Sequence, residues 1–195
     1  MEAIALDNPR LESRVTLSYR FFIAAFFILW AVSIADTASA QSGIELRLFA
    51  LERGIEMPFS TSPIKVGVMS MGDGRIANYS LPLESEGVFF AASVMLTQSL
   101  KTQSPQLILE VYLDSAAEGA GAQTIAQSAT SIDGRPARES FSKIQQAGME
   151  VRIYNIAIYD DGRVHNWSVQ EILELSEGKG EAIFRENMRR ISFPQ

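Results

Sequence analysis

Residues 151–173 of the sequence read VRIYNIAIYDDGRVHNWSVQEIL, which is two extended stretches separated by a turn signal. Alternate side chains in 151–159 form two faces that are both largely apolar, which is typical of a central strand covered on both sides. Asp160-Asp161-Gly162 predicts a hairpin turn. Residues 163–173 are therefore expected to return as an antiparallel partner of the first stretch.

Other stretches predict further strands. Residues 64–71 and 75–83 flank the tight-turn signal Gly72-Asp73-Gly74, and Pro82 places the second stretch at an edge or a strand end. Residues 88–97 and 107–113 are rich in β-branched and aromatic residues, and both are predicted to be strands.

Several segments are less regular. Residues 44–59 fit both a helical stripe and a strand alternation, and extended structure is preferred from Gly54 to Phe59. Residues 98–106 are expected to form a loop. Residues 114–128 are small and polar and contain two glycines, so a loop or a short, weak helix is expected there.

The chain is predicted to close with an amphipathic helix over residues 177–191. Farther upstream, Asp133-Gly134-Arg135-Pro136 predicts a turn. Runs of strands with few helices indicate an α+β fold, in which an antiparallel sheet is flanked by few helices and by this closing C-terminal helix.

The first forty residues have the pattern of a bacterial-type export signal. Arg10, Arg14 and Arg20 precede an uncharged, mostly apolar run of 15 residues, 21–35, and Ala38-Ser39-Ala40 follows before Gln41. A basic region, an apolar core and small residues at the A-x-A positions are typical of a secretory signal. We therefore expect residues 1–40 to be a signal peptide cut after Ala40. Residues 41–195 would form a single α+β domain in the periplasm or outside the cell.

An uncleaved N-terminal anchor is the alternative. The apolar run is shorter than the roughly 20 residues that a spanning helix needs. If it were retained, the preceding arginines would place the N-terminus in the cytoplasm and the domain outside. The sequence has no cysteine, so a lipid-anchored form, a disulfide and any cysteine-based site are excluded.

Composition narrows the possible functions. The formal net charge of the 195-residue chain is -6, which disfavours direct nucleic-acid binding because such binding depends on neutralising phosphates. His165 is the only histidine, and common zinc sites need several histidine or cysteine ligands, so His165 is interpreted as structural. Asp160 and Asp161 are the nearest carboxylate candidates, and turn chemistry is their favoured interpretation. The sequence predicts no catalytic, cofactor-binding or metal-binding residue.

Three other features have ordinary structural interpretations. Tyr154 and Trp167 could cap a binding surface but are expected in the core. A cluster of arginines near the end of the closing helix is explained by the helix dipole. Two glycosylation-like triplets begin at Asn78 and Asn166, and such triplets arise readily by chance.

The region from about Ser131 to Phe193 resembles the end of the PsbP/Mog1/DcrB-type domain. The matching residues are Gly134-Arg135-Pro136, Val151–Tyr159, Asp160-Asp161-Gly162, Val164–Val169 and Phe184 to Ser192-Phe193. Gly54 to Pro58 also resembles the entry segment of that fold. The resemblance implies an α/β/α sandwich around an antiparallel sheet and a non-enzymatic accessory or binding role, with no shared catalytic residues.

The leading hypothesis is an exported, non-enzymatic accessory or binding protein of the cell envelope, with no cofactor and a protein or small-molecule partner. One alternative is an envelope enzyme that uses carboxylates around Asp160 and Asp161. The other is an N-terminally anchored interaction module, which alone would involve the membrane.

The predicted cleavage site can be tested by intact-mass analysis and N-terminal sequencing of the exported protein. We expect Gln41 at the N-terminus. Ala40→Leu should leave residues 1–40 attached, because the cleavage site requires a small residue there. Ser39→Leu occupies the tolerant position between the two alanines and should be processed normally. A wild-type protein that retains Met1 would contradict cleavage.

Overall fold

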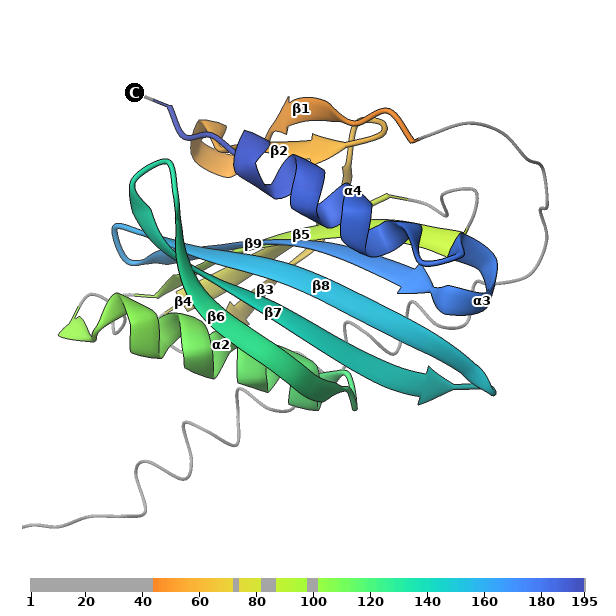
Figure 1. Cartoon of the computed structure of the whole chain (residues 1–195). Helices are drawn as coiled ribbons and strands as arrows, with labels where there is room; N and C mark the ends of the chain where they lie inside the picture. The colour runs from red at the N-terminus through yellow and green to blue at the C-terminus, as the bar shows by residue number, and fades with distance from the viewer. Residues whose placement is uncertain (1–43, 72–73, 82–86, 98–101, 195) are drawn as a thin grey trace, which may run out of the picture.

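The computed structural model describes residues 44–71, 74–81, 87–97 and 102–194 (Figure 1). Nine strands and three α-helices lie in this part of the chain, together with short 3-10 helices at Glu52–Gly54 and Met188–Arg190. The strands are β1 (Arg47–Ala50), β2 (Glu56–Phe59), β3 (Ile64–Met71), β4 (Gly74–Ser80), β5 (Val88–Thr97), β6 (Gln123–Ile132), β7 (Arg135–Gln146), β8 (Met149–Asp160) and β9 (Arg163–Ile172). The helices are α2 (Pro105–Gly119), α3 (Leu173–Ser176) and α4 (Lys179–Asn187).

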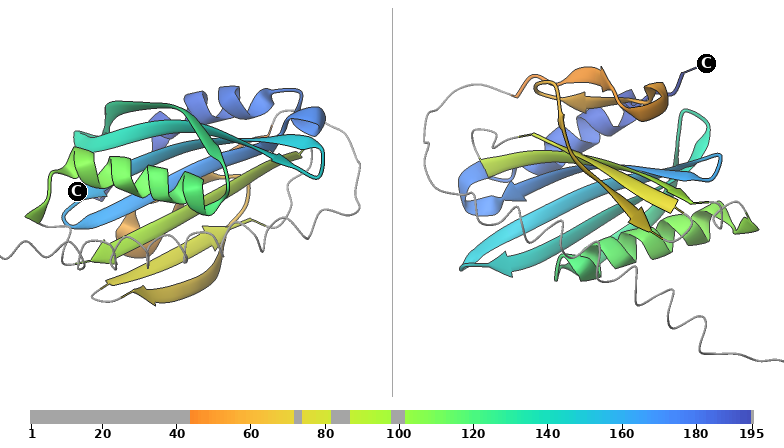
Figure 2. Two further views of the ribbon diagram at one scale, coloured as in Figure 1. Left: turned by 90° about the horizontal axis from the view of Figure 1, so that it is seen from below. Right: turned by 180° about the vertical axis from the view of Figure 1, so that it is seen from behind.

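Seven strands form one antiparallel sheet in the order β3-β4-β5-β9-β8-β7-β6. The sheet has α2 on one face, and α4 with the β1–β2 hairpin on the other (Figures 1 and 2). The predicted hairpin of residues 151–173 is confirmed as β8 and β9, and both strands lie inside the sheet. The α+β class is therefore confirmed in outline, although the sheet dominates. The layering agrees with the sandwich that the family resemblance implied.

The β6–β7 and β8–β9 turns have a backbone geometry that their residues favour. Asp161 and Gly162 have φ of 41° and 77°, and Asp133 and Gly134 have φ of 49° and 74°. Two consecutive residues with positive φ are the mark of a two-residue turn whose twist matches the strands, and Asp-Gly is a favoured pair for it. The predicted Asp160-Asp161-Gly162 turn is confirmed.

The prediction of a strand over residues 107–113 is wrong, because these residues belong to helix α2. Pro105 stands in the first turn of α2, where its missing N–H costs nothing. The buried side chains of α2 recur with helical spacing: Ile108, Leu109, Tyr112, Leu113, Ala116 and Ala117. A short apolar run suits either a strand or a buried helix, and here tertiary packing selects the helix.

The expectation of a loop or weak helix over residues 114–128 is also wrong. Helix α2 continues to Gly119, and the chain reverses at Gly121, whose φ is 67°. Strand β6 then begins at Gln123 and forms the edge of the sheet. Its small and polar side chains are mostly exposed, so no apolar alternation marks it in the sequence.

The predicted strands before residue 98 and the closing helix agree more closely with the structure. Strands β3, β4 and β5 occupy the predicted stretches, whereas Gly72, Asp73 and Pro82 lie outside the described residues. Extended structure before Phe59 is confirmed as β2. The closing helix is shorter than predicted, since Glu177 and Gly178 both have positive φ and α4 starts only at Lys179.

Trp167 of β9 joins the sheet to both elements that cover its α4 face. Its ring stacks on Phe184 of α4 with centroids 5.7 Å apart and on Phe90 of β5 at 6.4 Å. Its indole N–H donates a hydrogen bond of 2.8 Å to the backbone oxygen of Pro58 in β2. A buried tryptophan needs such a partner for its N–H, and this bond fixes the hairpin against the sheet.

The buried carboxylate of Glu171 orders the start of α4. Glu171 is fully buried and accepts hydrogen bonds from the Ser176 hydroxyl at 2.6 Å and the Gly180 backbone N–H at 2.8 Å. A negative charge is favourable at a helix N-terminus, where backbone N–H groups lack helical partners. A Cβ added at Gly180 would lie 2.8 Å from the carboxyl carbon of Glu171. Only glycine therefore allows the carboxylate to approach this closely.

Gly180→Ala should lower the free energy of unfolding by about 1–3 kcal/mol, because Glu171 must move and lose hydrogen bonds to a buried carboxylate. Gly67→Ala is the matched control, since a Cβ there meets nothing within 4 Å. The control should be neutral or slightly stabilising. Urea unfolding of both variants is the measurement, and equal stability of the two would contradict the role of Glu171.

Candidate functional site

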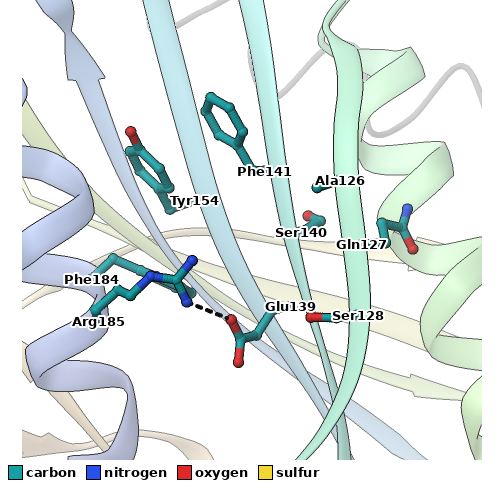
Figure 3. Close-up of a pocket in the computed structure, with 9 residues that line it drawn as sticks. All are labelled: Ala126, Gln127, Ser128, Glu139, Ser140, Phe141, Tyr154, Phe184 and Arg185. Atoms are coloured by element: carbon teal, nitrogen blue, oxygen red, sulfur yellow. Dashed lines mark hydrogen bonds and ion pairs between the residues drawn. The ribbon is translucent and has the colours of Figure 1, made fainter.

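A small pocket opens between α4 and the edge of the sheet formed by β6 and β7 (Figure 3). Its volume is about 90 Å³. The lining residues are Ala126, Gln127 and Ser128 of β6, Glu139, Ser140 and Phe141 of β7, Tyr154 of β8, and Phe184 and Arg185 of α4. We refer to this as the α4–β6 pocket.

Aromatic rings line one side of the pocket. Phe141 and Tyr154 stack with centroids 5.1 Å apart and planes 11° apart, and Tyr154 lies 6.0 Å from Phe184. Small side chains line the side toward β6: Ala126 pairs with Phe141, and Ser128 pairs with Glu139 in the strand register. The space exists because β6 carries small side chains at the positions beside the pocket.

An ion pair spans the pocket mouth from helix to sheet. Arg185 Nη1 lies 3.2 Å from Glu139 Oε2, and Arg185 Nε lies 3.2 Å from Glu181 Oε1. The Arg185 side chain is 60% exposed. Exposed pairs of this kind contribute little to stability, so their effect here is to set the charge around the pocket.

The Tyr154 hydroxyl is directed to Glu171 rather than into the pocket. It donates a hydrogen bond of 3.0 Å to Glu171 Oε1. Burial first, and then the adjacent Glu171 carboxylate, raise the pKa of Tyr154 well above its usual range. The phenol is therefore neutral at physiological pH. The pocket thus combines an aromatic surface with one ion pair, an arrangement suited to binding a small apolar group.

The structure places Asp160 and Asp161 away from this pocket, at the β8–β9 turn. Asp160 Oδ1 accepts a hydrogen bond of 2.8 Å from Arg135 Nε. Arg163 lies 3.9 Å from Asp160 and 4.0 Å from Asp161. The carboxylates of Asp160 and Asp161 therefore lie beside guanidinium groups and do not line the α4–β6 pocket. Within the described ranges, no group of three or more histidine, cysteine, aspartate or glutamate residues could hold a metal ion.

His165 lies in the core near the C-terminus. It is 2% exposed, and its ring packs edge-on against Phe193 with centroids 5.4 Å apart. Neither ring nitrogen has a hydrogen-bond partner among the residues that the structure describes. Burial lowers the pKa of His165 to about 4. The structural interpretation of this histidine agrees with its burial.

Four other side chains singled out in the sequence are buried. Tyr154 and Trp167 are in the core as predicted, and Tyr154 also lines the pocket. Asn78 and Asn166 are buried, which leaves neither amide accessible for glycosylation in the folded chain. Ala38, Ala40 and Gln41 lie outside the described residues. None of the helices in the described ranges combines the length and apolar character needed to span a membrane.

Comparison with solved structures finds the same fold in a cyanobacterial PsbP, named CyanoP, from a Synechocystis species. The match has a TM-score of 0.56 at 9% identity and covers 82% of this chain and 98% of that one. A Pseudomonas aeruginosa protein of unknown function, a putative regulator, matches with a TM-score of 0.46 at 14% identity, covering 77% of this chain and 97% of its own. LpqN from Mycobacterium tuberculosis, involved in cell envelope biogenesis, matches at 0.33 and 12% identity over 60% of this chain and 83% of its own.

No protein-family model and no curated protein sequence matches the chain. The similarity to the cyanobacterial PsbP concerns the fold alone, and the chain has a PsbP-like arrangement of its sheet and helices.

Sequence reasoning missed most of the pocket. Ala126, Ser128, Glu139 and Phe141 carry no motif, and the segment holding the first two was expected to be a loop or weak helix. Phe141 and Arg185 are 44 positions apart in the sequence. Only the closure of α4 over the sheet brings them together, so no local signal could have identified the site.

The buried imidazole should make stability depend on pH. Because the pKa of His165 is about 4 in the folded protein and 6.5 in a solvated chain, protonation favours unfolding. Stability should be highest above pH 6.5 and fall between pH 6.5 and 4, by about 3 kcal/mol from this group. His165→Leu should remove that part of the slope in urea unfolding at several pH values. An unchanged slope in the variant would show that His165 is not buried neutral.

Proposed function

We propose that this protein is an exported, non-enzymatic accessory protein of the cell envelope, which binds a partner at the α4–β6 pocket. The observation that carries the proposal is the pocket itself, where an aromatic surface lies beside an uncharged strand at the sheet edge. Concave sites with an apolar lining and a few placed polar groups are typical of binding sites. The pocket of about 90 Å³ is small, which favours one side chain or a similar group over a whole cofactor.

Export is supported by the sequence of residues 1–40, with its apolar run and the Ala38-Ser39-Ala40 motif. The domain would then work in the periplasm or outside the cell. The anchored version of the proposal differs only in whether residues 1–40 remain attached, and it leaves the pocket unchanged.

A carboxylate enzyme at Asp160 and Asp161 is less well supported. Both side chains sit at a hairpin tip beside Arg163, and Asp160 also bonds Arg135. Each carboxylate therefore lies beside a guanidinium group at the turn, and neither Asp160 nor Asp161 lines the α4–β6 pocket.

The proposal can be tested in intact cells with a photo-crosslinking residue at Ser128, at the pocket mouth. We expect a discrete adduct with an envelope component from this position. Leu175, which is 53% exposed on α3, is the matched control and should give none. The purified protein should also show no turnover with a panel of hydrolase and esterase substrates. Turnover that is lost in Asp160→Asn, or equal adducts from both positions, would contradict the proposal.

A further inference from the structure

Strand β6 forms an edge of the sheet, and a β-bulge interrupts its pairing with β7 between Thr124 and Ala126. Among the described strands it pairs only with β7, so its outer edge is open to another strand. Its ten residues, QTIAQSATSI, include neither a charged residue nor a proline. Natural edge strands are commonly protected by charges, proline or very short length. The regular stretch from Ala126 onward, beyond the bulge, lacks charges and proline and is therefore suited to pairing with a further strand.

The α4–β6 pocket lies where an added strand would need it. Ala126 and Ser128 are on the α4 face of β6, beside the pocket. In a strand added to an edge, alternate side chains stand on each face of the sheet. One of them would therefore project beside Ala126 or Ser128 toward the pocket. The volume of about 90 Å³ is below the roughly 150 Å³ of a cavity that holds benzene, which indicates an aliphatic side chain rather than an aromatic one.

A second copy of the same strand fits this site poorly. On its α4 face the middle of β6 carries Ala126, Ser128 and Thr130, which are too small to fill the pocket, and Ile132 at its end is buried in the core of its own chain. A dimer formed through two β6 strands would bury little apolar area, whereas stable homodimer interfaces are large and more hydrophobic. The pocket therefore favours a strand from a different polypeptide.

Carboxylates lie on both faces of the sheet beside β6. They favour a basic residue in the added strand, next to the aliphatic residue that occupies the pocket. On the α4 face, Glu139 and Glu181 share the single guanidinium of Arg185. On the α2 face, Arg138 Nη2 bonds Glu110 Oε2 at 2.7 Å, and Gln127 Nε2 bonds Asp114 Oδ1 at 2.6 Å. Each of these two groups has one carboxylate more than it has guanidinium groups, and Lys143, which pairs with Gln123 at the start of β6, lies two positions beyond Phe141 on the α4 face. A lysine or arginine beside the added strand would balance this charge.

We propose that β6 accepts an extended segment of a partner polypeptide as an eighth strand of the sheet. An aliphatic side chain of that segment occupies the α4–β6 pocket, and a basic residue lies next to the surrounding carboxylates. This inference rests on the proposed binding role of the pocket and names the class of partner.

The probe is a labelled peptide, acetyl-SKTLTVSK-amide, in which lysine, leucine and valine alternate with small polar residues. Fluorescence anisotropy with the purified, processed protein should show saturable binding. The same peptide with serine in place of leucine should bind at least roughly tenfold more weakly, because it leaves the pocket empty. Failure of the leucine peptide to bind, or equal binding of both peptides, would overturn the inference.

Two variants of β6 provide a matched comparison. Ala126→Trp places an indole at the pocket and should weaken peptide binding at least roughly tenfold. Ala129→Trp adds the same side chain to the opposite face of the strand, where Ala129 pairs with Arg138, and should have a much smaller effect. Circular dichroism establishes that both variants fold, and equal loss of binding in both would contradict occupation of the pocket.

The remaining outcomes separate this inference from the proposed function. Concentration-dependent self-association that Ala126→Trp abolishes would identify a second copy as the occupant and overturn the inference. An adduct from Ser128 in cells, without peptide binding, would retain the binding role and reject strand addition. Absence of any pocket-dependent adduct would reject the proposed function itself.

Discussion

The arrangement of the layers on the α4 face depends on the burial of Trp167 in the central strand β9. Its ring packs against Phe184 of α4, and its indole N–H needs a hydrogen-bond acceptor, which Pro58 of the β1–β2 hairpin supplies. One side chain thus fixes a helix near the end of the chain and a hairpin near its beginning against the same sheet. The aromatic series continues through Tyr154 to Phe141, so the core extends to the edge of the pocket.

The position of α4 is fixed at its N-terminus by hydrogen bonds to the buried side chain of Glu171. The carboxyl oxygens of Glu171 accept hydrogen bonds from the Tyr154 hydroxyl, the Ser176 hydroxyl and the Gly180 N–H. A buried carboxylate is tolerated only where hydrogen bonds replace its hydration. This arrangement links α4, which carries Phe184, to β8, which carries Tyr154, and both rings line the pocket. The inner wall of the pocket therefore belongs to the core, while its outer wall, β6, is an exposed edge.

The predictable parts of the fold were those with local physical causes. Asp161-Gly162 and Asp133-Gly134 are turn sequences because few other residue pairs adopt two positive φ values, so the β8–β9 turn and the turn before β7 could be located in advance. The helix α2 could not, since an apolar run such as residues 107–113 fits both a helix and a strand. Strand β6 was missed for the opposite reason, because an exposed edge strand needs no apolar alternation.

By itself, the sequence determined the antiparallel hairpin at 151–173 and the general α+β class. It also excluded disulfides and cysteine-based sites, and it predicts the export segment. These follow from the local rules of alternation, turn geometry and composition. The tertiary structure alone decided that residues 105–119 are a helix, that β6 forms an edge, and that Phe141, Tyr154 and Arg185 surround one pocket. Those features depend on contacts between residues distant in the chain, whose burial free energy no local pattern records.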